Sequence, residues 1–168
     1  RVQGFQTDDK GNIQNKLGDI KFPRALVPAK ATSKMRLDLN LDSRVQTAKV
    51  FDPKNPYDTS NYSTGLEMYD SQGNKHLVNM FFTKTADRTW SYHGLVDGKE
   101  ITGAKDDEMA KVVEGQITFT TDGKLDTETQ TMTAFNFKGG ALQNQQIKID
   151  FGDSITTDKG TGMDGSKQ

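Results

Sequence analysis

Residues 66–82 read LEMYDSQGNKHLVNMFF and contain the turn signal on which the fold-class prediction rests. Apolar residues flank the segment Asp70–Asn74, where glycine and asparagine can adopt the positive φ that a tight turn requires. Short apolar runs bounded by such a turn are typical of β-strands. This part of the chain therefore predicts a β-hairpin with strands through Leu66–Tyr69 and Leu77–Phe82.

The same alternation of strand and turn signals continues on both sides of this hairpin. Residues 35–42 read MRLDLNLD, a strict alternation of apolar and polar residues that predicts a strand with one buried face. Only Asp106–Val113 predicts a helical turn or two. Strands at such short spacing indicate an all-β fold, a sandwich or a barrel. Further strands are predicted at Trp90–Val96, Ile117–Thr120, Phe135–Phe137 and Ile147–Phe151, with turns at Asp97-Gly98 and Thr121–Leu125.

The two ends of the chain differ from its middle. Residues 1–33 contain Pro23, Pro28 and only short apolar pieces, such as Ile20–Phe22, while residues 152–168 are rich in glycine and polar residues. We therefore predict an outer β domain of residues 34–151, inserted into a partial second, intermediate β domain made of residues 1–33 and 152–168. The predicted core comprises Leu37, Leu39, Leu41, Leu66, Met68, Phe82, Trp90, Ile117, Phe119, Phe137, Ile147 and Ile149.

Composition excludes several classes of function. The 168 residues include 22 basic and 23 acidic side chains, and no basic stripe suggests nucleic-acid binding. No apolar run approaches the roughly 20 residues that span a membrane. Cysteine is absent, which excludes disulfides, thiol catalysis and cysteine-based zinc sites. Because the chain opens at Arg1 rather than Met, we expect it to be part of a longer protein.

Motifs that suggest chemistry have simpler explanations. Residues 160–165 match G-x-G-x-x-G, but the dinucleotide site also needs a following helix and a later acid, and the chain ends three residues on. Asp153, Asp158 and Asp164 are too irregularly spaced for a calcium loop. Two histidines, His76 and His93, without a G-x-S-x-G elbow, nominate no catalytic triad. The sequence thus predicts no catalytic residue, no cofactor and no metal site.

Trp90 and Tyr92 leave one alternative open. They alternate on one face of a predicted strand, where they could form a sugar-stacking platform or could pack as core aromatics. The first reading would make the chain a secreted carbohydrate-binding or adhesin β-sandwich module. The second reading is favoured.

Several segments together resemble the FlgE family of bacterial flagellar hook proteins. They occur in the order expected for that family and span nearly the whole chain, and the strongest is Tyr69–His76, which matches its Y-D-S-x-G-N-x-H hairpin. The other segments are Val2–Phe5, Pro28–Thr32 with Asn40–Ser43, Tyr57–Thr64, Phe119–Leu125 and Gly162–Gln168.

The resemblance implies a non-enzymatic, self-assembling subunit of the hook, the flexible universal joint that transmits torque from rod to filament. In that family, helical terminal segments line a tube, an intermediate β domain surrounds them and an outer β domain faces solvent. This chain would hold the outer domain and part of the intermediate one, and would not polymerise alone. Its partners would be other hook subunits and, at the hook ends, rod and hook–filament junction proteins. Its location would be the extracellular flagellum, reached through the flagellar secretion channel.

The residues singled out are therefore structural turn residues: Asp70, Gly73, Asn74, Asp122 and Gly123. Interface residues are not identified by the sequence. We expect Asp70 to accept hydrogen bonds from backbone N–H groups two or three residues on. We also expect Gly73→Val to destabilise the chain more than Gly103→Val, since Gly103 lies in a predicted irregular loop.

Overall fold

The computed structural model describes residues 3–8, 10–19, 28–47 and 50–168. Predictions for Val2, Ile20–Phe22 and Pro23 lie outside the described residues. Within them the chain is built almost entirely of strands, so the all-β fold class is confirmed. The elements are β1 (Gln3–Thr7), β2 (Ile13–Asp19), β3 (Lys34–Arg36), β4 (Tyr62–Tyr69), β5 (Lys75–Ala86), β6 (Thr89–Asp97), the 3₁₀-helix η1 (Gly98–Glu100), β7 (Met109–Phe119), β8 (Leu125–Met132) and β9 (Lys148–Asp150).

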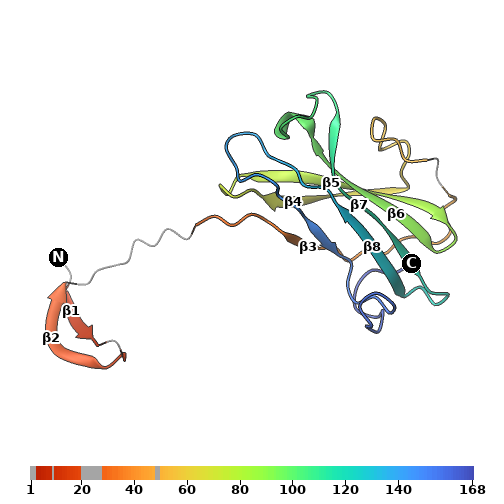
Figure 1. Cartoon of the computed structure of the whole chain (residues 1–168). Coiled ribbons are helices and arrows are strands. Elements are labelled where there is room, and N and C mark those ends of the chain that lie inside the picture. The colour runs from red at the N-terminus through yellow and green to blue at the C-terminus, as the bar shows by residue number, and fades with distance from the viewer. Residues whose placement is uncertain (1–2, 9, 20–27, 48–49) are drawn as a thin grey trace.

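Five consecutive strands form one antiparallel sheet in the order β4-β5-β6-β7-β8 (Figure 1). Each strand pairs with the next along the chain, which is a meander. The predicted hairpin is its first pair, with Leu66 opposite Val78 and Met68 opposite His76. The turns consequently fall alternately at the two ends of the sheet.

The main hydrophobic core covers one face of this sheet. Met80, Phe82 and Tyr92 point into it from β5 and β6, and Phe137, Ile149 and Phe151 cover it from the C-terminal half of the chain. Ten predicted core residues are buried: Leu39, Leu41, Met68, Phe82, Trp90, Ile117, Phe119, Phe137, Ile147 and Ile149. Leu37 and Leu66 are only partly buried and pack against the edge of the core.

The opposite face of the sheet is also partly covered. Phe81 alternates with Phe82 and is fully buried on this second face. The ring of Phe51 stacks on His93 with a centroid distance of 4.0 Å, and Tyr57 meets Phe81 edge-on at 5.0 Å. The loop that carries Phe51 and Tyr57 therefore folds over the sheet, which explains why β5 is apolar on both faces.

The predicted strand at residues 35–42 is shorter than expected. Only Lys34–Arg36 forms a regular ladder, parallel to β9. Leu37 N–H still donates to Asp150, but Leu39 and Leu41 exchange hydrogen bonds with Lys167 instead. The alternation predicted burial correctly, whereas this change of partner interrupts the ladder.

The predicted helical turn at Asp106–Val113 is wrong. Residues 109–113 belong to β7 and pair with the end of β6, where Met109 lies opposite Asp97 and Val113 opposite Gly94. Val112 and Val113 are both fully buried, and packing of these β-branched side chains in the sheet overrides the acidic, helix-like start.

The proposed domain boundaries stay a prediction. Residues 152–168 hydrogen-bond to the sheet and to the segment after β3: Ile155 N–H donates to Leu125, and Lys167 N–H to Leu39. These contacts favour a C-terminal segment that folds with residues 34–151. The hairpin β1–β2 places Phe5 opposite Leu17, and both side chains are exposed.

Candidate functional site

The corner Asp70–Asn74 joins β4 to β5 and is organised by one carboxylate. Asp70 is fully buried, and its Oδ1 accepts hydrogen bonds from the backbone N–H groups of Gln72 at 2.8 Å and Asn74 at 2.9 Å. Its Oδ2 accepts from Asn74 Nδ2 at 2.9 Å. The backbone donors lie two and four residues on, so Asp70 closes the whole turn.

These contacts decide the charge of Asp70. Burial by itself would raise the pKa of the carboxyl, but hydrogen bonds from Asn74, His76 and the backbone N–H groups outweigh burial and lower the pKa to about 2. Asp70 is therefore an anion at neutral pH that the protein itself solvates.

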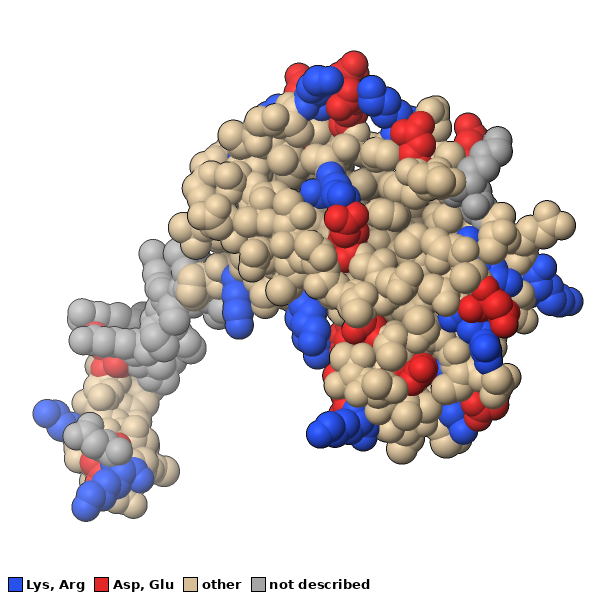
Figure 2. Space-filling model, turned by 45° about the vertical axis from the view of Figure 1, so that its right-hand side comes forward, with Lys and Arg blue, Asp and Glu red and all other residues tan. Residues whose placement is uncertain are grey.

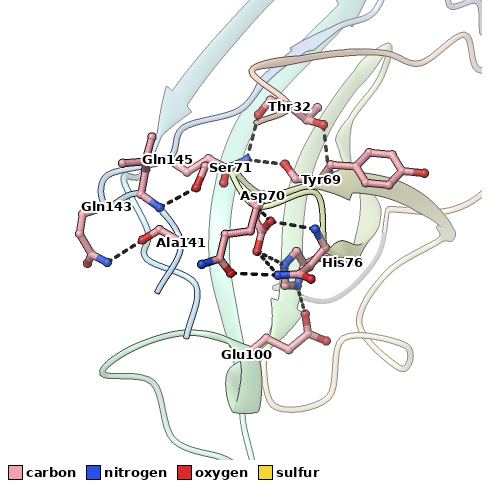
Figure 3. A network of polar contacts seen from close by, with 12 residues as sticks. Thr32, Tyr69, Asp70, Ser71, His76, Glu100, Ala141, Gln143 and Gln145 are labelled. Atoms are coloured by element: carbon pink, nitrogen blue, oxygen red, sulfur yellow. Dashed lines mark hydrogen bonds and ion pairs between the residues drawn. The ribbon is translucent and has the colours of Figure 1, made fainter. Parts of the chain in front are cut away.

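His76 connects the corner to two other parts of the fold (Figure 3). Its Nε2 lies 3.3 Å from Asp70 Oδ2, and its Nδ1 contacts Glu100 Oε2 of η1. The ring stacks on Phe137 with a centroid distance of 3.5 Å. One side chain thus ties β5, η1 and the segment around Phe137 together at this end of the sheet.

A second set of contacts fixes the segment before β3 to the corner. Thr32 N–H donates to the carbonyl of Tyr69 at 2.9 Å, and Tyr69 N–H donates to Thr32 Oγ1 at 3.0 Å. Gln145 Nε2 donates to the carbonyls of both Thr32 and Tyr69, at 3.0 and 3.1 Å (Figure 3). Ser71 Oγ accepts from Leu142 N–H at 2.7 Å. With η1, which contacts the corner through Glu100, four separate segments of the chain therefore meet here: the segment at Thr32, the corner itself, η1 and residues 137–145.

Gly73 has a φ of +87°, a backbone conformation that residues other than glycine rarely adopt. The turn residues Asp70, Gly73 and Asn74 thus lie together in one network. The sequence did not single out Thr32, Glu100 or Gln145, and their residue types in exposed-looking segments give no local signal of such a role.

The second predicted corner, around Asp122 and Gly123, joins β7 to β8 at the opposite end of the sheet. Gly123 has a φ of +78°, and a β-carbon there would collide with the carbonyl of Gln168. Asp122 forms an ion pair with Lys124 at 2.7 Å, and hydrogen bonds from Lys124 and Thr120 lower the pKa of Asp122 to about 2. This corner seats the last residues of the described chain.

The motifs that suggested chemistry have structural partners. Asp164 pairs with Arg36 at 3.2 Å, and Asp158 Oδ2 accepts from Ser154 Oγ at 2.9 Å. His93 packs on Phe51, and burial lowers the pKa of His93. Among the described residues, no group of three or more His, Cys, Asp or Glu side chains is placed to hold a metal ion.

The rings of Trp90 and Tyr92 do not form a sugar platform. Each is 1% exposed, and the Tyr92 hydroxyl donates to the carbonyl of Thr129 at 3.2 Å. Because both rings lie inside the core, the carbohydrate-binding alternative loses the residues on which it depended. Within the described part of the chain, no helix is long and apolar enough to cross a membrane.

Comparisons with known proteins agree on one family. The family model of the flagellar basal body protein FlaE D2 domain matches residues 40–168. The chain is 32% identical over 77 residues to the flagellar hook protein FlgE of Escherichia coli. The matched stretch covers 45% of the chain and 19% of that protein. The corresponding match to FlgE of Salmonella typhimurium is 34% over 76 residues, covering 44% and 19%.

A more distant relative matches more of the chain. Flagellar hook protein FlgE of Helicobacter pylori is 27% identical over 104 residues, which is 61% of the chain and 14% of that protein. In all three comparisons the matched stretch spans less than a fifth of the relative's length.

Proposed function

Because the chain belongs to the family of the flagellar basal body protein FlaE D2 domain, we propose that it is the outer part of a structural subunit of the bacterial flagellar hook. The observation that carries this proposal is the match over residues 40–168, which spans the whole five-stranded sheet and the C-terminal segment packed on it. The subunit assembles with copies of itself into the universal joint between rod and filament, and meets rod and hook–filament junction proteins at the hook ends. It acts outside the cell, after export through the flagellar channel, and without catalysis.

The organisation of the two corners supports a structural role. The carboxylates of Asp70 and Asp122 interact with groups of their own turns. Asp70 accepts hydrogen bonds from backbone N–H groups, and Asp122 pairs with Lys124. A catalytic carboxylate must instead face a cleft where a substrate can reach it. The hydrogen bonds and ion pair of these two carboxylates therefore hold the shape of the turns.

The described surface suits contacts that form and break. Acidic and basic side chains are interspersed on the face shown in Figure 2. Several ion pairs are exposed, such as Lys75–Glu67, in which both side chains are 58% exposed. Pairs of this kind contribute about 0–1 kcal/mol each and are screened by salt. Contacts between neighbouring subunits made by exposed charges of this kind would be individually weak, which suits subunits that slide past one another.

Immunogold electron microscopy tests the proposal. Antibodies raised against the 168-residue chain should decorate the hooks of intact flagella from the bacterium that encodes it, with the filament unlabelled. Deletion of the gene should remove both the labelled hook and motility. Label spread over the cell surface, with hooks unlabelled, would support the adhesin alternative and overturn the hook proposal.

A further inference from the structure

We propose that a pocket beside Trp90 binds a small neutral molecule that has an apolar ring and one hydrogen-bond acceptor. This Trp90 pocket has a volume of about 140 Å³, and Leu41, Val45, Tyr62 and Trp90 supply its apolar walls. It lies where the segment after β3 meets the start of β4 and β6. The inference rests on the lining residues and does not depend on the hook assignment.

The indole N–H of Trp90 is the first argument for a ligand. Trp90 is 1% exposed, and its Nε1 has no hydrogen-bond acceptor among the residues that the structure describes. A buried indole N–H usually finds an acceptor, and a donor left without one costs free energy. Tyr92, its neighbour on the same face of β6, does have an acceptor, the carbonyl of Thr129. Because the Trp90 ring lines the pocket, an acceptor bound there would be the partner of this N–H.

The polar side chains of the pocket favour a neutral ligand with a single polar group. The carboxylate of Asp42 pairs with Arg44 at 2.8 Å, and its charge disfavours an anion in the pocket. The amide of Asn61 is already engaged, since its Nδ2 donates to the carbonyl of Gln46 and its Oδ1 accepts from Lys84 N–H. A buried water typically makes about three hydrogen bonds, which these two side chains do not supply. A molecule with an apolar body and one acceptor therefore fits the pocket better than water.

The size and walls of the pocket limit the ligand to about one ring. An apolar cavity of roughly 150 Å³ takes a benzene-sized molecule, which is close to the volume of the Trp90 pocket. Leu41 is 3% exposed and belongs to the core, whereas Tyr62 is 47% exposed. The pocket thus reaches from solvent to the core, and a six-membered ring can enter beside Tyr62.

A buried cation holds one wall of the pocket in place. Lys84 is 7% exposed, and its Nζ donates to the carbonyls of Ser43 at 2.6 Å and Val45 at 3.0 Å. The loop that carries Val45 is therefore fixed to β5 by hydrogen bonds from a charged donor, which are stronger than neutral ones. A wall fixed in this way makes the pocket largely preformed, as ligand pockets usually are.

Nuclear magnetic resonance on the full 168-residue chain tests the site, because its single tryptophan gives one indole N–H resonance. Cyclohexanone is the probe, since it is a six-membered ring with one carbonyl acceptor. Its addition should shift the indole proton resonance downfield until the site is saturated, as a new hydrogen bond does. Cyclohexane has the same ring without the acceptor and should cause no downfield shift. This comparison uses the parent chain and requires no variant.

Filling the pocket gives a second test. Val45→Phe places a ring inside the pocket and should abolish the shift caused by cyclohexanone. Val50→Phe is the matched control, because Val50 is 92% exposed and does not line the pocket, so the shift should be retained. The backbone amide resonances of both variants show whether each is folded.

Three results would overturn the inference. The indole resonance could stay unmoved up to the solubility limit of cyclohexanone. The shift could be as large in folded Val45→Phe as in the parent chain, which would place the probe elsewhere. A cross-peak between the indole proton and a long-lived water could persist at the highest cyclohexanone concentration, which would show that the pocket holds water only.

Discussion

A β-carbon on Gly73 would lie 3.2 Å from the β-carbon of Ala29, which belongs to the segment leading into Thr32. The glycine at the hairpin corner therefore does two things. It adopts a φ of +87° that closes the turn, and it leaves room for a segment 44 positions earlier in the chain. The closing of the turn and the room for Ala29 beside it thus depend on the same position.

We expect Gly73→Val to destabilise the chain by about 1 kcal/mol or more through the backbone conformation alone, with an added cost from Ala29. The sequence predicted a larger loss for Gly73→Val than for Gly103→Val. The structure shows that Gly103 also has a positive φ, of +84°, but that a β-carbon at Gly103 would meet nothing within 4 Å. Gly103→Val should thus carry the backbone cost without the contact. Urea denaturation of both variants measures the difference, and an equal loss would show that Ala29 yields freely.

Leu39→Ala should lower the free energy of unfolding by about 2–4 kcal/mol. Leu39 is 9% exposed and belongs to the core, although it lies outside the regular part of β3. Leu142→Ala is the control, since Leu142 is 75% exposed and should change stability by about 0.5 kcal/mol or less. Chemical denaturation gives both values. If Leu39→Ala lowered the free energy of unfolding by no more than the control does, Leu39 would not be packed in the core, and the assignment of the buried face of residues 35–42 would be wrong.

The sequence predicted best those elements whose signals are local. The hairpin around Asp70–Asn74 combines turn residues with flanking apolar runs, and the structure forms it as β4 and β5, with Leu66 opposite Val78. The helical turn predicted at Asp106–Val113 was wrong because the acidic residues at its start are typical of a helix N-terminus. Residues 109–113 form a strand because they pair with β6, a tertiary contact that has no local sequence signal.

The polar network at the corner could be predicted only in part. Asp70 and Gly73 are turn residues that carry their own signal. Gln145 contacts Thr32 across 113 positions, and Glu100 reaches His76 across 24. A glutamine or glutamate in a polar stretch is most often solvated, and only the meeting of four segments makes these side chains structural.

Arg88→Gly should stabilise the chain by up to about 1 kcal/mol. Arg88 lies in the two-residue turn between β5 and β6 with a φ of +54°, a conformation that costs energy for residues with a β-carbon. Among the residues that the structure describes, the side chain of Arg88 forms an exposed ion pair with Asp87 at 3.4 Å. Thermal unfolding should show a higher melting temperature, and a lower one would mean that the Arg88 side chain contributes more than this geometry implies.

Fluorescence of Trp90 should report a buried, sugar-insensitive ring. The chain has a single tryptophan, 1% exposed, so its emission should be blue-shifted and resistant to quenching by iodide. Addition of mono- and oligosaccharides should leave the spectrum unchanged. Saturable quenching by a sugar, absent after denaturation, would revive the carbohydrate-binding reading.

Acid should remove the stabilisation that Asp70 contributes. Its folded pKa of about 2 lies below the ordinary value of 3.8, so the anion is favoured by folding. This contribution is fully present above about pH 4 and is lost as the pH falls towards 2. Asp70→Asn keeps the volume but places an amide where an acceptor is needed, and should cost about 1–3 kcal/mol at pH 7.

The gap between the parent chain and Asp70→Asn should therefore narrow as pH falls from 4 to 2. Asp87→Asn, at the exposed turn between β5 and β6, serves as control and should change stability by about 0.5 kcal/mol or less at either pH. Urea denaturation at pH 7 and pH 2.5 measures both variants. A gap that stays constant across this range would mean that Asp70 acts through shape, and that its charge contributes nothing to the corner.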